Sequence, residues 1–123
     1  MSKKILVVDD EPDILKVVIF RIKKLGYDVS IASNGQEALD MLKDDHPGLI
    51  IMDIAMPVMD GLTATVKIRE NGAYNDIAIL ILTASKLTDG LEERVLESGA
   101  NGLITKPFEA QDFISAVQNM LPL

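Results

Sequence analysis

Short runs of consecutive apolar residues alternate along this chain with longer segments in which apolar residues recur every three or four positions. Three of the runs are continuous, at residues 5–8, 49–52 and 77–82. A continuous apolar run is typical of a strand buried on both faces, as in a parallel sheet covered by helices. Residues 27–32 alternate apolar and polar instead, which predicts an edge strand, and residues 103–105 are a weaker fifth candidate.

The segments between these runs have the apolar spacing of amphipathic helices and residues typical of helix ends. We expect the first helix to start at Asp10 before Pro12 and to end at Gly26, and the second to start with a capping box over Ser33–Gln36. The third should run from Asp60 to Asn71–Gly72, the fourth from Thr88–Asp89 to Gly99, and the fifth should start near Glu109. The residues expected to face the core are Ile14, Leu15, Val18, Ile22, Leu25, Ala38, Leu39, Leu42, Leu62, Val66, Ile68, Leu91, Val95, Leu96, Phe113, Ile114, Val117 and Met120.

This alternation predicts an α/β fold made of five strand–helix units in series. Strands that alternate with helices pair in parallel, and their crossovers are right-handed. We expect one domain over residues 1–123, with a doubly wound five-stranded sheet in the order 2-1-3-4-5. That order is one of the two common ones for such sheets, and it gives a flavodoxin-like three-layer sandwich with five helices.

Composition removes several classes of protein. The 123 residues include 12 Lys+Arg and 19 Asp+Glu, a net charge of -7, which argues against a nucleic-acid partner. No apolar run approaches the roughly 18 residues that cross a bilayer, so we expect no membrane association and a cytoplasmic location. Because the chain has no Cys and one His, His46, it has no disulfides, thiolate metal sites or multi-histidine sites.

Polar residues follow four of the five predicted strands. Asp9 and Asp10 come after the first strand, Asp53 after the third, Thr83 after the fourth and Lys106 after the fifth. The carboxyl ends of parallel strands share one edge of a sheet, and ligand sites form there, where the direction of connection reverses between strands 1 and 3. We therefore expect the three aspartates to meet at that edge.

Each of these residues has an ordinary interpretation when it is taken alone. An Asp pair after a strand is usually a loop or a helix cap, and a Lys before Pro is usually a solvated charge. Together, however, clustered carboxylates require a compensating charge, which a Mg²⁺ ion or Lys106 can provide. A carboxylate nucleophile, a metal, an ammonium and the Thr83 hydroxyl make up the groups needed for phosphoryl transfer to an aspartate.

The segments that carry these residues resemble those of a response-regulator receiver domain, over essentially the whole length of the chain. The matching segments are ILVVDDEP (5–12), LIIMDIAMPVMDG (49–61), ILILTAS (79–85) and LITKPF (103–108). As a set they are highly specific for this family of two-component signalling proteins.

The resemblance implies that Asp53 accepts a phosphoryl group from the phosphohistidine of a histidine kinase or a histidine phosphotransfer protein. It implies a phosphoprotein that does not turn over external substrates, and an output partner that binds the face formed by the fourth helix, the fifth strand and the fifth helix. It implies that Asp10, Asp53 and the Ala55 backbone carbonyl bind Mg²⁺ or Mn²⁺, and that Asp9 binds the ion largely through water. It also implies that Thr83 and Lys106 bind the phosphoryl oxygens. The Lys106–Pro107 bond is often cis in the family.

Two departures from the family pattern concern the switch. Leu103 stands where the family usually has a Tyr or Phe whose rotation reports activation, so we expect the signal to pass through movement of the backbone after Thr83 instead. Ala55 and Ser85 lie at the positions that tune hydrolysis of the phosphorylated aspartate. Neither side chain is an acid or an amide that could orient water, so we expect a long-lived phosphorylated state.

Phe20 and His46 are the remaining residues of interest. Helical spacing places Phe20 on the face of the first helix opposite Ile14 and Val18, where the family commonly has a polar residue. Phe20 either packs on a neighbouring helix or is a harmless exposed residue, or else it anchors the helices of a kinase. His46 lies beside Pro47, and we interpret it as a loop residue.

Three other functions compete with the signalling function for this pattern of residues. An aspartyl phosphohydrolase usually has a second Asp two residues after its nucleophile, where this chain has Ala55. A flavodoxin-type flavin carrier has a hydroxyl-rich first loop, whereas Asp9-Asp10-Glu11-Pro12 would repel phosphate without a metal. A receiver-like adaptor that is never phosphorylated stays possible because of Leu103. We also expect no output domain in this chain.

Overall fold

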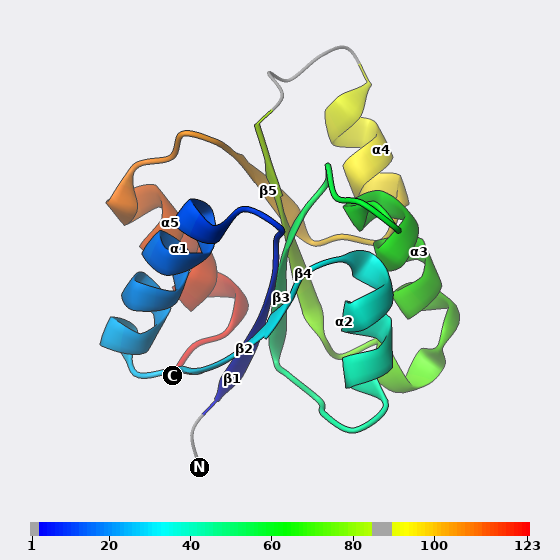
Figure 1. The fold of residues 1–123 in the computed structure, drawn as a ribbon, viewed down its shortest axis with the longest axis horizontal. Coiled ribbons are helices and arrows are strands. Elements are labelled where there is room, and N and C mark those ends of the chain that lie inside the picture. The colour runs from blue at the N-terminus through cyan, green and yellow to red at the C-terminus, as the bar shows by residue number, and fades with distance from the viewer. Residues whose placement is uncertain (1–2, 85–89) are drawn as a thin grey trace.

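A central parallel sheet runs through the molecule and is covered by helices on both faces (Figure 1). The computed structural model describes residues 3–84 and 90–123. Within that part of the chain the strands are β1 (Lys4–Val8), β2 (Asp28–Ala32), β3 (Leu49–Asp53), β4 (Ala78–Thr83) and β5 (Gly102–Thr105). The helices are α1 (Pro12–Leu25), α2 (Gly35–Leu42), α3 (Gly61–Glu70), the 3₁₀ turn η1 (Gly72–Tyr74), α4 (Leu91–Glu97) and α5 (Ala110–Met120).

The strand order is β2-β1-β3-β4-β5 and every pairing is parallel, which confirms the predicted fold class and topology. β2 pairs only with β1, so the alternating segment is an edge strand, as predicted. The register aligns Asp53 of β3 with Leu82 of β4, and Thr83 with Thr105 of β5. The strands therefore end side by side, and the residues that follow them emerge at one edge of the sheet.

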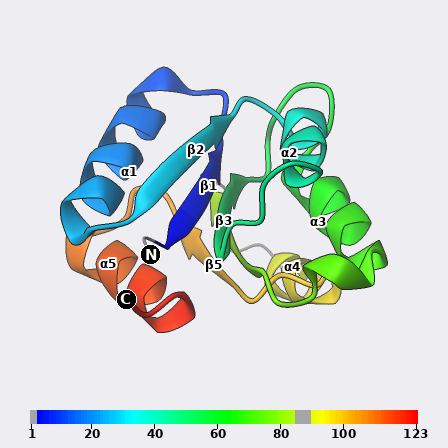
Figure 2. The same cartoon turned by 90° about the horizontal axis from the view of Figure 1, so that it is seen from below.

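The two faces of the sheet have separate cores, which explains why the central strands are apolar at every position. Figure 2 shows α1 and α5 on one side of the sheet, and α2, α3 and α4 on the other. Ile5 and Val7 of β1 pack with the α1 and α5 side chains, whereas Leu6 and Val8 pack with those of the opposite layer. Because successive strand residues point to opposite faces, a strand covered on both sides needs apolar residues throughout.

The helix ends agree with the sequence signals at some positions and differ at others. Gly26 ends α1 with φ 105°, and the Asp60 side chain caps α3 by accepting from the Thr63 N–H, both as predicted. Asp10 does not cap α1, because the N-cap is Glu11 and makes no side-chain capping bond. The capping box at residues 33–36 was also wrong, since Asn34 caps α2 one position later.

Two residues that were predicted to face the core lie at the surface instead. Val66 of α3 is 44% exposed and Leu96 of α4 is 54% exposed. Each helix buries a narrower stripe than its apolar residues suggest: α4, for example, buries Leu91 and Val95 one turn apart. The turn η1 was not predicted, and the expected start of the fourth helix at Thr88–Asp89 lies outside the described residues.

None of the helices in the described ranges combines the length and the apolar character needed to span a membrane.

Candidate functional site

Backbone hydrogen bonds hold the ends of the strands in line at the carboxyl edge of the sheet. The Asp9 N–H donates to the Ala32 carbonyl at 3.1 Å, and the Ile54 N–H donates to Leu82 at 3.2 Å. The Lys106 N–H donates to the Thr83 carbonyl at 2.7 Å. These bonds continue the ladders one residue beyond the strands, so the polar side chains at the ends of the strands start from a fixed backbone.

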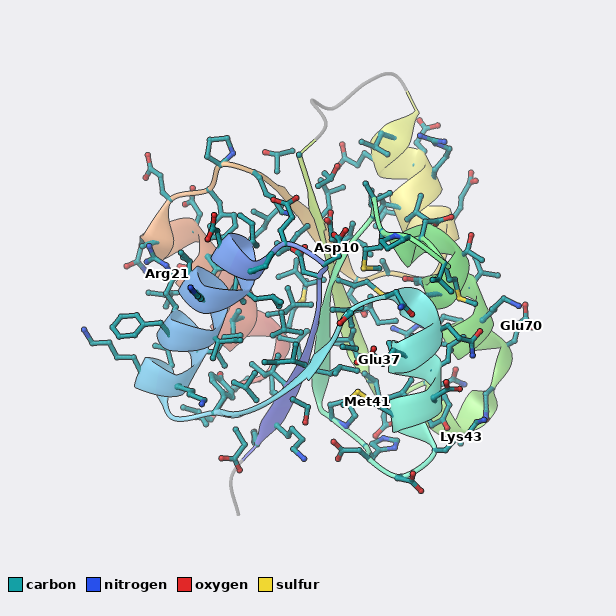
Figure 3. All side chains as sticks on the ribbon, viewed as in Figure 1. Asp10, Arg21, Glu37, Met41, Lys43 and Glu70 are labelled. Carbon is teal, nitrogen blue, oxygen red and sulfur yellow. The ribbon has the colours of Figure 1, made fainter. Side chains whose placement is uncertain are left out.

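Three carboxylates from two strand ends come together at this edge, and we call Asp9, Asp10 and Asp53 the acidic cluster. One carboxylate oxygen from each lies within 4.8 Å of the others. Asp9 and Asp53 are buried, with 1% and 3% exposure, whereas Asp10 faces solvent at the end of the sheet (Figure 3). The structure thus brings together the three aspartates that the topology predicted to meet, and the cluster is open to solvent on the side of Asp10.

Lys106 enters the same site from the end of β5. Its Nζ atom lies 3.2 Å from Asp9 Oδ2 and 3.5 Å from Asp53 Oδ2, and its side chain is 9% exposed. The following Lys106–Pro107 peptide bond is cis, as the resemblance implied. One ammonium therefore faces two buried carboxylates and leaves a net negative charge at the site.

The electrostatics of the site favour a cation. Burial raises the pKa of Asp53 above its ordinary value; the Lys106 ammonium lowers it and the neighbouring Asp9 carboxylate raises it again. The net upward shift means that the ionised Asp53 is held at a cost when the cluster is alone. A hard divalent cation takes oxygen ligands and stabilises ionised carboxylates, so the donor set of the acidic cluster fits Mg²⁺.

The other residues singled out from the sequence lie in different places. Thr83 is the last residue of β4, the strand next to β3, and is 2% exposed. Ala55 is exposed in the loop after β3, and Leu103 is half-buried in β5. Phe20 is 65% exposed, which excludes the interpretation that it is packed away against a neighbouring helix. Ser85 lies outside the described residues.

Two residues of the site were not identified from the sequence. Gly61, the first residue of α3, lies under the Asp53 backbone: a Cβ at this position would be 2.1 Å from the Asp53 carbonyl oxygen. Glu11 lies at the rim, with its carboxylate 4.0 Å from Lys106 Nζ. A Gly directly after the capping Asp60 was the available signal for the first, but no local pattern marks Glu11 as a neighbour of a lysine 95 positions away.

The chain matches the family model described as "Response regulator receiver domain" over residues 5–118. Among curated relatives, the probable transcriptional regulator ycf27 of Porphyridium aerugineum is 37% identical over 122 residues, which are 98% of this chain and 48% of that protein. The chain thus spans about half the length of the curated relatives it matches.

Solved structures are similar over the whole fold. The chemotaxis response regulator CheY4 of Vibrio cholerae has a TM-score of 0.91 and 30% identity, covering 98% of this chain and 100% of that one. The receiver domain of the sensor histidine kinase PA1611 from Pseudomonas aeruginosa has a TM-score of 0.88 and 30% identity, with 98% of each chain covered. That receiver domain has a magnesium ion coordinated in its active-site cleft.

Proposed function

This chain belongs to the response regulator receiver domain family of two-component signalling, and from that membership we propose that it takes up a phosphoryl group on Asp53 from a phosphohistidine and thereby changes its binding of a protein partner. The observation that carries the proposal is the convergence of the acidic cluster with the ammonium of Lys106 at one edge of the sheet. An acyl phosphate needs a carboxylate nucleophile and positive charge on both sides of the incoming group, and these residues provide the nucleophile, one cation and the ligands for a second.

The chain's own residues divide the work of the transfer. A carboxylate oxygen of Asp53 attacks the phosphorus and forms an O–P bond, while the P–N bond breaks and the donor imidazole keeps the electron pair. Lys106, held at the end of β5, pairs its ammonium with the phosphoryl oxygens as they approach. The Thr83 hydroxyl, at the neighbouring strand end, donates a hydrogen bond to one of those oxygens.

The metal expected at this site is Mg²⁺, held by Asp10 and Asp53, by Asp9 largely through water, and by the Ala55 backbone carbonyl. The ion supplies positive charge that neutralises the carboxylates and the phosphoryl oxygens. The magnesium in the active-site cleft of the PA1611 receiver domain supports this assignment. Because the donors are all oxygens, Mn²⁺ can also occupy the site.

Partners follow from the same family membership. The phosphoryl donor is a histidine kinase or a histidine phosphotransfer protein, and the output partner binds the face made by α4, β5 and α5. A hollow of about 310 Å³ on this face is lined by Leu103, Phe108 and Asp112, among others, which supports a protein contact there. Phosphorylation adds charge and acceptor oxygens beside Thr83, and this biases the backbone at the end of β4.

The test is direct phosphorylation by a small-molecule donor. We expect the protein, incubated with Mg²⁺ and acetyl phosphate, to form one adduct that is labile to hydroxylamine and that peptide mass spectrometry places on Asp53. The variant Asp53→Asn should form none, and Lys106→Ala should form much less. An adduct on another residue, or none at all, would contradict the proposal and favour an adaptor that acts without phosphorylation.

A further inference from the structure

Three Asn–Gly steps occur in this chain, at residues 34–35, 71–72 and 101–102. Such a step has a chemistry of its own, because glycine has no Cβ that shields its backbone nitrogen or restricts the approach of that nitrogen to the preceding side chain. The nitrogen can attack the amide carbon of the asparagine and close a succinimide ring. In a folded protein the reaction therefore depends on how firmly the structure holds the two residues.

The first step is fixed at the start of α2. The Asn34 side chain accepts from the Glu37 N–H at 2.8 Å, and the Gly35 N–H donates to the Met59 carbonyl at 3.2 Å. Gly35 is buried, and a Cβ built on it would lie 2.9 Å from Ala64 Cβ. The nitrogen of this step is thus engaged in a hydrogen bond and has no space in which to move toward the side chain.

The third step is fixed at the start of β5. Asn101 Oδ1 accepts from the Ile79 N–H at 2.8 Å and from Arg69 Nη2 at 3.0 Å. Gly102 is the first residue of β5 and is aligned with Leu80 of β4. Rotation of the Asn101 side chain toward the nitrogen of Gly102 would break both of these hydrogen bonds, so the sheet protects this step.

The second step, Asn71–Gly72, is open. It joins α3 to η1, and both of its residues are exposed. Glu70, directly before it, lies at the outer edge of the molecule in Figure 3. The Asn71 side chain accepts from the Ala73 N–H at 3.0 Å, a surface bond that water can replace. Apart from its chain neighbours, a Cβ on Gly72 would come no closer than 3.9 Å to another group, the side-chain amide of Asn75.

We propose that Asn71 is a site of spontaneous deamidation, and that the fold directs the reaction to this step and away from the other two. The Gly72 nitrogen forms a bond to Asn71 Cγ, the Cγ–Nδ2 bond breaks, and ammonia leaves with the proton that the Gly72 nitrogen gives up. Water then opens the succinimide. Breaking the bond to Cγ yields aspartate, and breaking the main-chain bond yields isoaspartate.

The two products change the junction between α3 and η1 in different ways. Aspartate adds a negative charge at the carboxyl end of α3, where the helix dipole disfavours it. Isoaspartate adds a carbon atom to the main chain just before η1. Tyr74 of η1 accepts from Arg69 at 3.0 Å through its carbonyl and donates to the Leu42 carbonyl at 3.1 Å through its hydroxyl. Isoaspartate should therefore loosen these bonds and lower the stability of the fold.

The experiment follows all three steps in the full chain. After incubation at neutral and at mildly alkaline pH, peptide mass spectrometry measures the gain of about 1 Da at each asparagine. The peptide with Asn71 should convert at least about tenfold faster than those with Asn34 and Asn101, a difference of about 1.4 kcal/mol in the barrier. The rate should rise with pH, because the attacking nitrogen has to lose its proton. Fragmentation at the N–Cα bond distinguishes isoaspartate from aspartate.

The unfolded chain is the control for local chemistry. In guanidinium chloride the three steps should convert at similar rates, because only the fold distinguishes them. Gly72→Ala should slow conversion at Asn71 by about tenfold or more and should fold like the parent, since the space for its methyl group is open. Asn71→Ser keeps a capping oxygen and should abolish the mass gain in that peptide. The isoaspartate form, separated by ion exchange, should unfold at lower urea than the parent.

Three outcomes would overturn the proposal. The first is conversion of Asn34 or Asn101 in the folded chain as fast as that of Asn71, because the fold would then not select the step. The second is a folded chain in which Asn71 stays unchanged, whether or not it converts in guanidinium chloride. The third is an undiminished rate in Gly72→Ala. Asp53→Asn should convert like the parent, so failure of phosphorylation and failure of this proposal are separate results.

Discussion

Asp53 and Asp9 are carboxylates almost fully removed from water, and a single ammonium from Lys106 is shared between them. Burial of unpaired charge is costly, and the raised pKa of Asp53 reports that cost. Such a buried cluster is expected where its negative charge serves to bind a ligand. The site is therefore expected to destabilise the metal-free molecule slightly and to recover that free energy when a cation is bound.

Magnesium should stabilise the folded chain through the acidic cluster. At a hundredfold excess over its dissociation constant, an ion that binds only the native state adds about 2.7 kcal/mol to the free energy of unfolding. Thermal unfolding with Mg²⁺ and with EDTA measures the shift, which should largely vanish in Asp10→Ala. Asp44→Ala removes an exposed acid from another part of the molecule and should keep it. An undiminished shift in Asp10→Ala would remove Asp10 from the ligand set.

Asp60 should make a pH-dependent contribution as the cap of α3. Slight burial raises its pKa, but hydrogen bonds from the Thr63 N–H and hydroxyl, each 2.9 Å long, outweigh that effect, and the pKa is lowered overall. A carboxyl with a lowered folded-state pKa stabilises the fold above its unfolded value of about 3.9, and this stabilisation is lost as pH falls through the folded value.

Replacing Asp60 by Ala should therefore lower the free energy of unfolding by about 1 kcal/mol at pH 7, and by less at acidic pH as the parent carboxylate becomes protonated. Urea unfolding at pH 7 and at about pH 3 gives the two differences. Asp60→Asn keeps a capping oxygen and should cost only a few tenths of a kcal/mol at either pH. A difference for Asp60→Ala that grows on acidification would show that the carboxylate does not stabilise the cap.

Among the elements, α3 constrains the loop that follows Asp53. Its first residue, Gly61, donates its N–H to the Ile54 carbonyl at 2.9 Å and lies against the Asp53 backbone with no room for a Cβ. The loop between β3 and α3 also has Val58 at φ 68°, a conformation that non-glycine residues rarely adopt. The Asp53 end of the strand is thus fixed by the helix that follows it.

The other end of α3 is joined to β5 through Arg69. Its guanidinium donates to the Gly99 carbonyl at 2.9 Å, to the Tyr74 carbonyl at 3.0 Å and to Asn101 Oδ1 at 3.0 Å. Asn101 Oδ1 in turn accepts the Ile79 N–H at 2.8 Å, so one side chain connects α3, η1, β4 and the segment before β5. Gly99 has φ 102° and its Cα lies beneath the Arg69 stem.

Loss of this connection should destabilise the whole fold. Arg69→Met keeps the apolar stem but removes three hydrogen bonds, including the one to the Gly99 carbonyl, and we expect it to lower the free energy of unfolding by about 2 kcal/mol in urea titrations. Lys67→Met, two residues earlier and exposed on the same helix, should change it by no more than about 0.5 kcal/mol. If the two variants were equally stable, the hydrogen bonds of Arg69 would not contribute to stability.

At the scale of the whole molecule, the sheet separates two helical layers, with α1 and α5 on one side and α2, α3 and α4 on the other (Figures 1 and 2). The acidic cluster lies at the carboxyl edge of the sheet, between these layers. Under the proposed function, a signal from Asp53 to the face made by α4, β5 and α5 would cross β4 and β5, where Leu103 is aligned with Ile81. Leu103 has no ring or hydroxyl that could change partners, so we expect the backbone to carry the change.

Beryllofluoride with Mg²⁺, a mimic of a bound phosphoryl group, should therefore shift backbone amide resonances at residues 83–84 and 90–105. Leu103→Ala should leave most of those shifts in place, because the hydrogen bond from the Lys106 N–H to the Thr83 carbonyl, rather than the side chain, couples the strands. Asp53→Ala is the control that should show no shifts. Amide shifts confined to the acidic cluster would mean that the output face does not respond.

The sequence alone determined the five strands and five helices, although not the turn η1, and the polar residue types at the strand ends. Continuous apolar strands report burial on both faces, and polar residues placed at the ends of parallel strands must share one edge, so Asp53, Lys106 and their neighbours could be identified without coordinates. Helix signals were weaker, because a cap depends on which side chain reaches the free N–H groups, and Asn34 and Glu11 were each one position away from the expected residue.

Only the tertiary structure decided what depends on distance between remote segments. It gave the separations of Lys106 from Asp9 and Asp53, and it buried two of the three carboxylates while leaving Asp10 in solvent. It placed Val66 and Leu96 at the surface and exposed both residues of the Asn71–Gly72 step. The physical reason is that periodicity specifies which side of an element is apolar, whereas the neighbour that covers that side is chosen by packing.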